Sequence, residues 1–319
     1  MRRLALAALA LALAGVVAAP VRPARAQPAP VTIIAVGDIS PEPAEQKTDD
    51  MATAAIGIGA NPARFLLLGD LQYENGTIGK YRDARGYVAS WGRPQIYSRS
   101  VPAYGNHELM DTAPVPAGTP SAAGYFEFFR PRIAAMAETG DPVQGYYRTT
   151  IGAWRVYVLA TDCRNQDGTG PSCAQGSPQQ RWLADDMLTA PRCTMAIGHQ
   201  GRWGSGFFAD DADIDPLWGT FRNRGGDVWL AGHEHHYARF GPLDRNGNLV
   251  STSPGTRVFV VGTGGRSLLG PRIPPHQGLR FRDFNHYGVL RMTLNATGWS
   301  SEFRRTDGVI ADRAAAGCA

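Results

Sequence analysis

Short apolar runs recur along this chain, and each stops at a glycine followed by a polar side chain. The runs cover residues 31–36, 65–68, 101–104, 194–197 and 227–231, and they are closed by Gly37-Asp38, Gly69-Asp70, Gly105-Asn106, Gly198-His199 and Gly232-His233. Short, continuously apolar segments are typical of strands buried on both faces in α/β proteins, where functional side chains gather at the carboxyl ends of strands. The pattern therefore predicts an α/β fold with its chemistry at five strand ends.

Further strands and two helices are predicted between and after these runs. Residues 145–150 and 154–160 are expected to form strands joined by a tight turn, and residues 257–261 and 286–294 to form later strands. A helix is predicted over 49–59. A second helix should run from Pro178 to about Leu188, with Ser177 as its N-cap and Gln180 closing a capping box.

Three segments carry no clear periodicity. Residues 74–90 and 111–124 are rich in glycine, proline and polar side chains, and we expect them to be surface loops that frame a pocket. The alanine-rich tail after Asp312 is expected to be poorly ordered unless Cys318 ties it down.

The N-terminus has the composition of an export signal. Arg2 and Arg3 precede an almost unbroken run of Leu, Ala and Val over 4–17, and Ala24-Arg25-Ala26 is a small-x-small cleavage site. We predict a signal peptide over 1–26, followed by a single catalytic domain over 27–319 that is secreted or periplasmic. A retained N-terminal anchor is the alternative. No later segment is long and apolar enough to span a bilayer.

Charge argues against a nucleic-acid-binding protein. The first 26 residues hold four of the 32 basic residues and none of the 28 acidic ones, so the mature chain would be close to neutral. A basic binding platform for nucleic acid is therefore not predicted. The sequence does not indicate an oligomeric state.

The four cysteines suit an oxidising compartment. Cys163 and Cys173 flank a loop rich in Gly, Asn and Asp, and we expect them to pair. Cys193 and Cys318 are candidates for a second bridge, although Cys193 could instead be a buried free thiol. None of the four has the CxxC spacing of a zinc ribbon or redox motif.

The polar residues at the strand ends are all oxygen or nitrogen donors, as a hard or borderline metal ion requires. His235 follows His233 by two residues, a spacing that places both rings on one face of an extended segment. Tyr73 follows Asp70 by three residues, although it could simply pack in the core. The candidate donors are Asp38, Asp70, Tyr73, Asn106, His199, His233 and His235.

The order of these motifs resembles a known signature. Gly-Asp, Gly-Asp-x-x-Tyr, Gly-Asn-His-Glu, Gly-His and Gly-His-x-His follow one another as in the calcineurin-like metallophosphoesterases. The tyrosine in the second motif resembles the one in the purple acid phosphatase branch of this family. Flanking segments such as 72–76 and 261–265 resemble the secreted bacterial members of that branch. The resemblance implies a four-layer α/β/β/α sandwich with two mixed β-sheets.

The resemblance also implies a site for two metal ions. Asp38, Asp70, Tyr73 and His235 would hold metal one, whereas Asp70, Asn106, His199 and His233 would hold metal two. His107 would face the substrate without binding metal. The implied reaction is hydrolysis of phosphomonoesters by a hydroxide that bridges the metals. A phenolate ligand favours Fe(III), so the expected pair is Fe(III) with divalent Zn, Fe or Mn.

Two departures from the family pattern bear on function. Asp38-Ile39-Ser40 lacks the histidine that many relatives carry in the first motif, and Tyr73 would supply the missing ligand. After His199 the chain has Gln200-Gly201-Arg202 where relatives often have histidines that contact substrate. Arg202 is a candidate phosphate contact, or else an ordinary surface arginine.

Other functions stay open at this point. The enzymatic alternative is an extracytoplasmic phosphodiesterase or nucleotidase, so the substrate would be a small phosphate ester or a nucleotide. A metal-holding protein without catalysis is the alternative from another class. Glu108 and Glu234 are predicted to support the site without binding metal. The chain has no P-loop, Gly-x-Ser-x-Gly or His-Glu-x-x-His motif.

Overall fold

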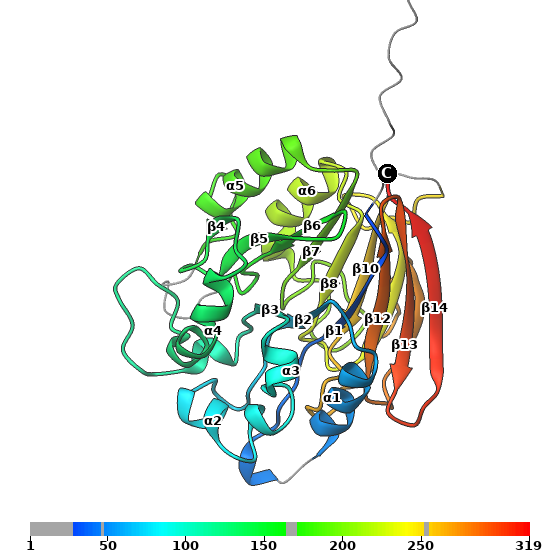
Figure 1. The fold of residues 1–319 in the computed structure, drawn as a ribbon. Coiled ribbons are helices and arrows are strands. Elements are labelled where there is room, and N and C mark those ends of the chain that lie inside the picture. Colours follow the sequence, from blue (N-terminus) through cyan, green and yellow to red (C-terminus); the bar gives the residue numbers. More distant parts are fainter. Residues whose placement is uncertain (1–27, 46–47, 164–170, 252–254) are drawn as a thin grey trace, which may run out of the picture.

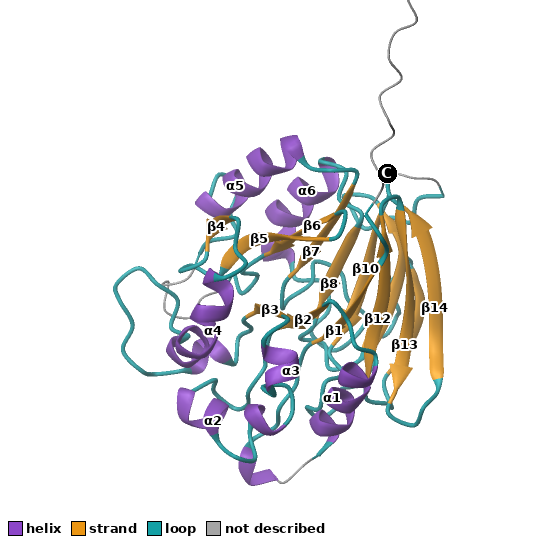
Figure 2. Cartoon of the chain, viewed as in Figure 1, coloured by secondary structure: helices purple, strands orange, loops and turns teal. Residues whose placement is uncertain are grey.

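Two stacked β-sheets with helices on either side make up the protein (Figures 1 and 2). The computed structural model describes residues 28–45, 48–163, 171–251 and 255–319. The predicted signal peptide over 1–26 lies outside these residues. Within the described residues, no helix has the length and apolar character needed to cross a membrane.

The first sheet has six strands in the order β14-β13-β12-β1-β2-β3. Strands β1, β2 and β3 run parallel on one side of this sheet, whereas β12, β13 and β14 join antiparallel on the other. The strands are β1 (Val31–Val36), β2 (Arg64–Leu68), β3 (Ser100–Ala103), β12 (Gly288–Asn295), β13 (Gly298–Arg305) and β14 (Ile310–Gly317).

The second sheet has eight strands in the order β11-β9-β10-β8-β7-β6-β5-β4. Strands β6, β7, β8 and β10 run parallel at its centre, and antiparallel strands flank them. The strands are β4 (Thr139–Asp141), β5 (Tyr146–Ile151), β6 (Trp154–Val158), β7 (Cys193–Ile197), β8 (Val228–Ala231), β9 (Tyr237–Leu243), β10 (Thr256–Val261) and β11 (Leu279–Asp283).

Helices α1 to α4 lie along the six-stranded sheet, and α5 and α6 cover the eight-stranded one (Figure 1). The helices are α1 (Asp49–Gly59), α2 (Ile78–Arg82), α3 (Pro94–Tyr97), α4 (Ala123–Ala134), α5 (Pro178–Asp186) and α6 (Asp215–Asn223). Short 3-10 turns are η1 (Pro43–Glu45), η2 (Tyr87–Ala89), η3 (Glu108–Met110), η4 (Met187–Thr189) and η5 (Ala212–Ile214).

Two apolar cores account for this layering. The larger core includes Ile33 to Val36 of β1 without a gap, so both faces of that strand are buried, as its continuous apolar run predicts. The smaller core joins the eight-stranded sheet, through Tyr157 and Trp229, to Leu183 of α5 and Trp218 of α6. The predicted α/β fold with two mixed sheets is confirmed.

The structure corrects two local predictions. Residues 74–90 do not form a surface loop, because they include α2 and η2 and fully bury Tyr81 and Tyr87 against Phe128 and Phe129. The aromatic spacing there follows no helical or strand period, so the sequence pattern did not reveal it. The predicted capping box of α5 is shifted: Ser177 Oγ accepts from the Gln180 amide, but the Gln180 side chain accepts from Gly176.

The C-terminal tail is ordered. Residues 310–317 form strand β14 at the edge of the six-stranded sheet, and Cys318 beyond it is bonded to Cys193 at the start of β7. This disulfide joins the two sheets, and the second one links Cys163 to Cys173. Both predicted pairings are present. The chain-entropy model assigns roughly 5 kcal/mol to a link between residues as far apart in sequence as Cys193 and Cys318.

Candidate metal centre

The carboxyl ends of the parallel strands in both sheets converge on one place. The Gly37 amide after β1 donates to Val261 of β10 at 2.8 Å, which joins the two sheets at this edge. The His199 ring after β7 reaches the carbonyl of Leu68 in β2, also at 2.8 Å. The five predicted strand ends therefore lie together, although they come from two different sheets.

Unusual backbone geometry points the donor side chains into this space. Asp38, Asp70, His233 and His235 have φ values of 57°, 49°, 69° and 42°, in the left-handed region that non-glycine residues rarely adopt. Such conformations cost roughly 1–3 kcal/mol each and gather at functional sites. A Cβ atom on Gly105 would lie 2.2 Å from Asp70 Oδ1, so only glycine allows this close approach.

Two groups of side chains that could hold a metal ion share Asp70. One consists of Asp70, His199 and His233, and the other of Asp38, Asp70 and His235, with donor atoms within 4.8 Å of one another in each group. Asp70 Oδ2 lies 3.1 Å from His199 Nε2, and Asp38 Oδ1 lies 3.3 Å from His235 Nε2. Asn106 Oδ1 joins the first group, 3.1 Å from His199 Nε2. We call these residues, together with Tyr73, the donor cluster.

The surroundings of Tyr73 fit a cation. Its hydroxyl oxygen lies 3.0 Å from Asp38 Oδ1, 2.9 Å from Asp70 Oδ2 and 3.1 Å from His235 Nε2. A phenol has one proton to donate, so it can satisfy one of these three acceptors. A positive ion among the four atoms satisfies all of them, which is why this donor set suits a metal.

Backbone carbonyls fix the ring nitrogens that face the donor cluster. His199 Nδ1 lies 2.8 Å from Leu68 O, and His235 Nδ1 lies 2.8 Å from Ser267 O. When Nδ1 of a neutral imidazole donates its proton to a carbonyl, Nε2 keeps a lone pair for a metal. Both rings therefore present the correct atom to the cluster.

Charge in the donor cluster also favours a cation. Burial lowers the pKa of His199, but the nearby Asp70 carboxylate more than reverses this and raises it to about 10. Burial, reinforced by the His199 charge, lowers the pKa of His233 to about 4. Burial, and then Asp38 and Asp70, hold the pKa of Tyr73 well above its usual value. The buried carboxylates thus require a compensating positive charge, which a bound ion would supply with release of protons.

Glu108 organises the backbone around the donor cluster. Its buried carboxylate accepts from the amides of Asp70, Leu71 and Gly105 at 2.7–2.9 Å. Burial, and then the charge of Asp70, raise the pKa of Glu108 to about 7. The expectation that Glu108 supports the site agrees with these contacts.

His107 stands at the open side of the cluster. Its amide donates to Asp70 Oδ1 at 2.9 Å, and its Nδ1 contacts Glu74 O at 2.5 Å. This leaves Nε2 directed toward the cluster, 3.9 Å from Asp70 Oδ2. The His107 side chain is 17% exposed, so it lies where a ligand in the pocket can contact it.

The structure brings a different arginine to the site from the one that the sequence indicated. Arg202 pairs with Asp215 at 3.1 Å and stacks on Trp203, and it does not line the pocket over the donor cluster. Arg266 does line that pocket, and its guanidinium lies 4.6 Å above the Tyr73 ring. The only sequence signal for Arg266 was its position directly after the glycine-rich loop 262–265.

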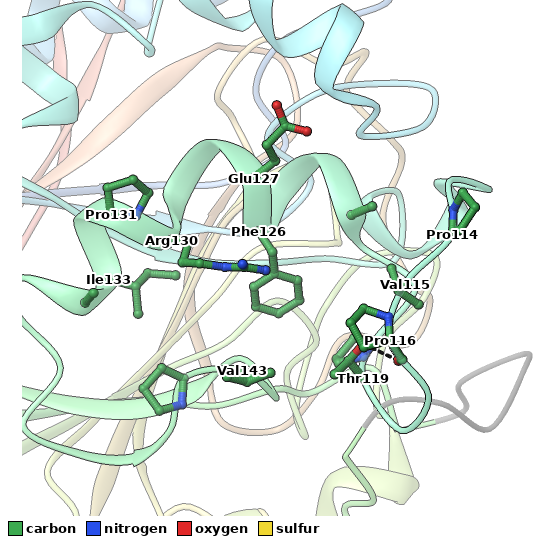
Figure 3. A pocket seen from close by; sticks show the side chains of 14 residues that line it. Pro114, Val115, Pro116, Thr119, Phe126, Glu127, Arg130, Pro131, Ile133 and Val143 are labelled. Carbon is green, nitrogen blue, oxygen red and sulfur yellow. Dashed lines mark hydrogen bonds between the residues drawn. The ribbon is translucent and has the colours of Figure 1, made fainter.

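Among the described residues, three cavities lie at the donor cluster, beside it or along the 111–122 loop. One of about 350 Å³ opens over the donor cluster, and a neighbouring one of about 390 Å³ starts at Asn106 and His233. The largest, about 570 Å³, is an apolar groove between α4 and the 111–122 loop, where Pro116 and Phe126 face the same space (Figure 3). The 111–124 segment is thus a loop that frames a pocket, as predicted, but none of the predicted site residues lines that pocket.

Comparisons with solved structures agree with the observed fold. A purple acid phosphatase from yellow lupin (Lupinus luteus) seeds superposes with a TM-score of 0.67 at 18% identity, over 91% of this chain and 54% of that one. A protein called PhoD gives 0.58 at 15% identity, over 92% and 69%. GAP50, described as the anchor in the inner membrane complex of Plasmodium, gives 0.60 at 10% identity, over 91% and 89%. At these identities the likeness concerns the fold.

Sequence comparison is more specific. Uncharacterized proteins from two strains of Mycobacterium tuberculosis are 28% identical over 239 residues, which is 65% of this chain and 42% of each relative. The chain thus spans less than half the length of these curated relatives. The profile of the calcineurin-like phosphoesterases matches residues 31–237, which is well over half of the chain and includes every residue of the donor cluster. This chain belongs to the calcineurin-like phosphoesterase family.

Proposed function

We propose that this protein hydrolyses phosphate monoesters at a centre of two metal ions, outside the cytoplasm. The observation that carries the proposal is the position of Asp70, one buried carboxylate shared by two groups of metal-compatible side chains. Sharing a carboxylate offsets the repulsion between two neighbouring cations. Bound ions would supply Lewis acidity, which activates water and neutralises charge on the phosphoryl oxygens.

The metal ligands in this proposal follow the two groups. Asp38, Asp70, Tyr73 and His235 would hold one ion, and Asp70, Asn106, His199 and His233 the other. Tyr73 favours Fe(III) at the first position, with divalent Zn, Fe or Mn at the second.

His107 and Arg266 are the residues that would act on the substrate. His107 Nε2 faces the open side of the cluster, where it can hydrogen-bond the phosphate or give a proton to the leaving oxygen. Arg266 lines the same pocket, and its guanidinium, which pairs with Glu45 and Glu74, is the cationic group that a phosphate there would meet. Arg202 is not part of this proposal, since it does not line that pocket.

Export is supported by the two disulfides, which form and persist in oxidising compartments. The signal peptide over 1–26 remains a prediction. The reaction of this chain is inferred from its own site, because the longer curated relatives are uncharacterized.

The first test is metal analysis of the purified mature protein by mass spectrometry, with a visible spectrum and an assay of phosphate release on the same sample. We expect about two metals per chain including iron, a violet tyrosinate–Fe(III) band, and turnover of a phosphomonoester. Two metals without colour would exclude a ferric ion on Tyr73 but would agree with the proposed hydrolase activity. Bound metal without turnover of any ester would favour a binding protein, and no bound metal after reconstitution would overturn the proposal.

A further inference from the structure

The cavity beside His233 has a composition unlike that of the donor cluster. Its inner end is formed by Asn106 and His233, and its outer part by Phe207 and Phe208 together with several acidic side chains. At about 390 Å³ it has room for a small organic group. This cavity shares Asn106, Phe208 and His233 with the one over the donor cluster, so the leaving group of an ester whose phosphate lies at the cluster can extend into it.

The two phenylalanines are unusually exposed for large apolar side chains. Phe207 is 78% and Phe208 46% exposed, and their rings meet edge to face with centroids 5.1 Å apart. The Phe208 ring lies 5.0 Å from that of His233. Adjacent exposed aromatic residues at the rim of a cavity are typical of ligand-binding sites, because aromatic faces stack on planar groups.

The loop that carries this aromatic pair is held in place by the same segment that carries two metal ligands. Glu234 accepts from the Gly206 amide at 2.7 Å, and His236 Nε2 contacts Ser205 Oγ at 2.9 Å. These two residues alternate with His233 and His235. One side of the segment therefore faces the donor cluster, and the other fixes the aromatic loop beside it.

A Cβ atom on Gly206 would lie 2.2 Å from Glu234 Oε2, so a larger residue at this junction would displace the Glu234 carboxylate. Asp210 pairs with Arg272 and holds the far end of the loop. The aromatic pair is thus attached to the site through buried polar contacts at one end and an ion pair at the other.

Acidic side chains predominate among the charged groups that line this cavity, and one of them, Asp210, is paired with Arg272. Asp162, Asp210 and Asp211 line it, and among the described residues that line it there is no lysine or arginine. A further phosphate group on a leaving group would meet carboxylates there and, among the described lining residues, none of the cationic side chains that bind phosphate. A leaving group with a neutral ring, or with a ring that carries hydrogen-bond donors, would fit this cavity.

We propose that Phe207 and Phe208 form a leaving-group subsite that selects phosphate monoesters carrying a planar ring and no further phosphate. The inference rests on the proposed phosphoesterase activity and narrows its substrate class to aryl-bearing esters or nucleoside monophosphates. Phe207 provides the exposed stacking face, and Phe208 closes the space next to His233.

The test compares esters that differ only in the planarity of the ring. Benzyl phosphate and cyclohexylmethyl phosphate have similar size and leaving-group basicity. We expect kcat/KM to favour the benzyl ester roughly tenfold, a ratio within the range of aromatic stacking. Phe207→Leu keeps an apolar side chain and removes the ring, so it should bring the ratio close to one. Leu188→Ala, at an exposed apolar residue of η4, is the control that should keep the preference for the benzyl ester.

Nucleotides identify the source of the ring. A preference for adenosine monophosphate over ribose 5-phosphate that is lost in Phe207→Leu assigns the subsite to nucleosides. A preference in the benzyl pair alone assigns it to smaller aryl esters. Adenosine 3′,5′-bisphosphate, an ester with a second phosphate on the leaving group, should be a poorer substrate than adenosine 5′-monophosphate, and equal rates would overturn the role given to the acidic lining. An unchanged benzyl ratio in Phe207→Leu would overturn the subsite.

Binding of phosphonates separates this inference from the proposed activity. Benzylphosphonate and cyclohexylmethylphosphonate cannot be hydrolysed, so calorimetry with the metal-loaded protein measures ring selection alone. Tighter binding of the benzyl compound without turnover of any ester keeps the subsite and contradicts the activity. Turnover of esters with equal binding of both phosphonates keeps the activity and contradicts the subsite.

Discussion

The two halves of the donor cluster are supported in different ways. In the histidine half (Asn106, His199 and His233), the fully buried His199 is fixed by Leu68 O, within a strand of the opposite sheet. In the tyrosine half (Asp38, Tyr73 and His235), the His235 side chain is 12% exposed, and its ring is fixed by Ser267 O, in the loop after β10. Sheet backbone is less mobile than loop backbone.

This difference has a consequence for metal binding. An ion in the histidine half would rest on a frame that both sheets share, whereas an ion in the tyrosine half would depend on the position of the 262–269 loop. The ligands act in the opposite direction to the frame, because the Fe(III) proposed for the tyrosine half is trivalent and would be bound by a phenolate and two carboxylates. We therefore expect the divalent ion of the histidine half to be lost first on chelation. Three substitutions test this comparison, because they should remove the ions of both halves, of neither half and of one half.

The largest effect should come from Asp70→Asn, because Asp70 is the one side chain that both groups share. We expect loss of both ions and of detectable phosphate release, since replacing outer partners of metal ligands already costs about 10–100-fold. Metal analysis and a turnover assay measure this. Asp312→Asn is a matched control, a buried carboxylate paired with Arg239 away from the site. Retention of one ion at full occupancy in Asp70→Asn would mean that the halves are independent.

His107→Ala should leave both halves filled and slow the reaction. His107 contacts Asp70 through its backbone amide, which the alanine variant keeps, and its ring faces the substrate side. We expect kcat to fall by about 10²–10⁴-fold with metal content unchanged. His286→Ala, at a histidine paired with Asp283, serves as the control. Unchanged kcat in His107→Ala would remove this residue from the chemistry.

Tyr73→Phe should empty one half. The phenol oxygen is the atom that Asp38, Asp70 and His235 surround, so its removal takes a ligand from the tyrosine half alone. We expect about one metal per chain and no violet band, with the ion of the histidine half retained. Tyr237→Phe removes an equally buried hydroxyl that donates to Asp312, and it should keep both ions and the colour. If Tyr73→Phe stays violet, the colour has another origin.

The sequence was sufficient to locate the donor cluster but not its surroundings. Asp38 and Asp70 could be placed because each directly follows a run that is apolar on both faces. The contact between His199 and Leu68 could not be predicted, since it depends on how the two sheets stack. Arg202, three residues after the predicted ligand His199, pairs with Asp215. Arg266 comes from a loop 31 residues beyond the predicted ligand His235.

The aromatic pair was missed for a related reason. Phe207 and Phe208 lie in a loop without periodicity, and their position depends on Glu234 and His236 holding Gly206 and Ser205. The alternation of Glu234 and His236 with two predicted ligands was the available signal. It indicated that the other side of the segment also has a polar function, but not which loop it would hold.

Glu108→Gln tests the frame that both halves share, and we expect the smallest effect from it. The Glu108 carboxylate accepts from several backbone amides around Asp70. A glutamine side chain has only one acceptor oxygen, so its NH₂ group would face some of those N–H donors. Metal affinity should fall by about 10–100-fold, with the free energy of unfolding lowered by about 1–3 kcal/mol. Isothermal titration with metal and urea unfolding measure the two effects.

Asp227→Asn is the matched control for this last prediction. Asp227 is a buried carboxylate that accepts from the amides of Thr194 and Ala319, each at 2.8 Å, and it lies before β8, at the opposite end of that strand from the donor cluster. Its substitution should lower stability by a similar amount and leave metal affinity unchanged. If both variants lose metal affinity equally, the effect of Glu108 is one of general stability. If only Glu108→Gln loses metal affinity, and the affinities for both ions fall together, then the Glu108 carboxylate positions both halves. The difference between the halves then comes from the carbonyls of Leu68 and Ser267, which fix His199 and His235.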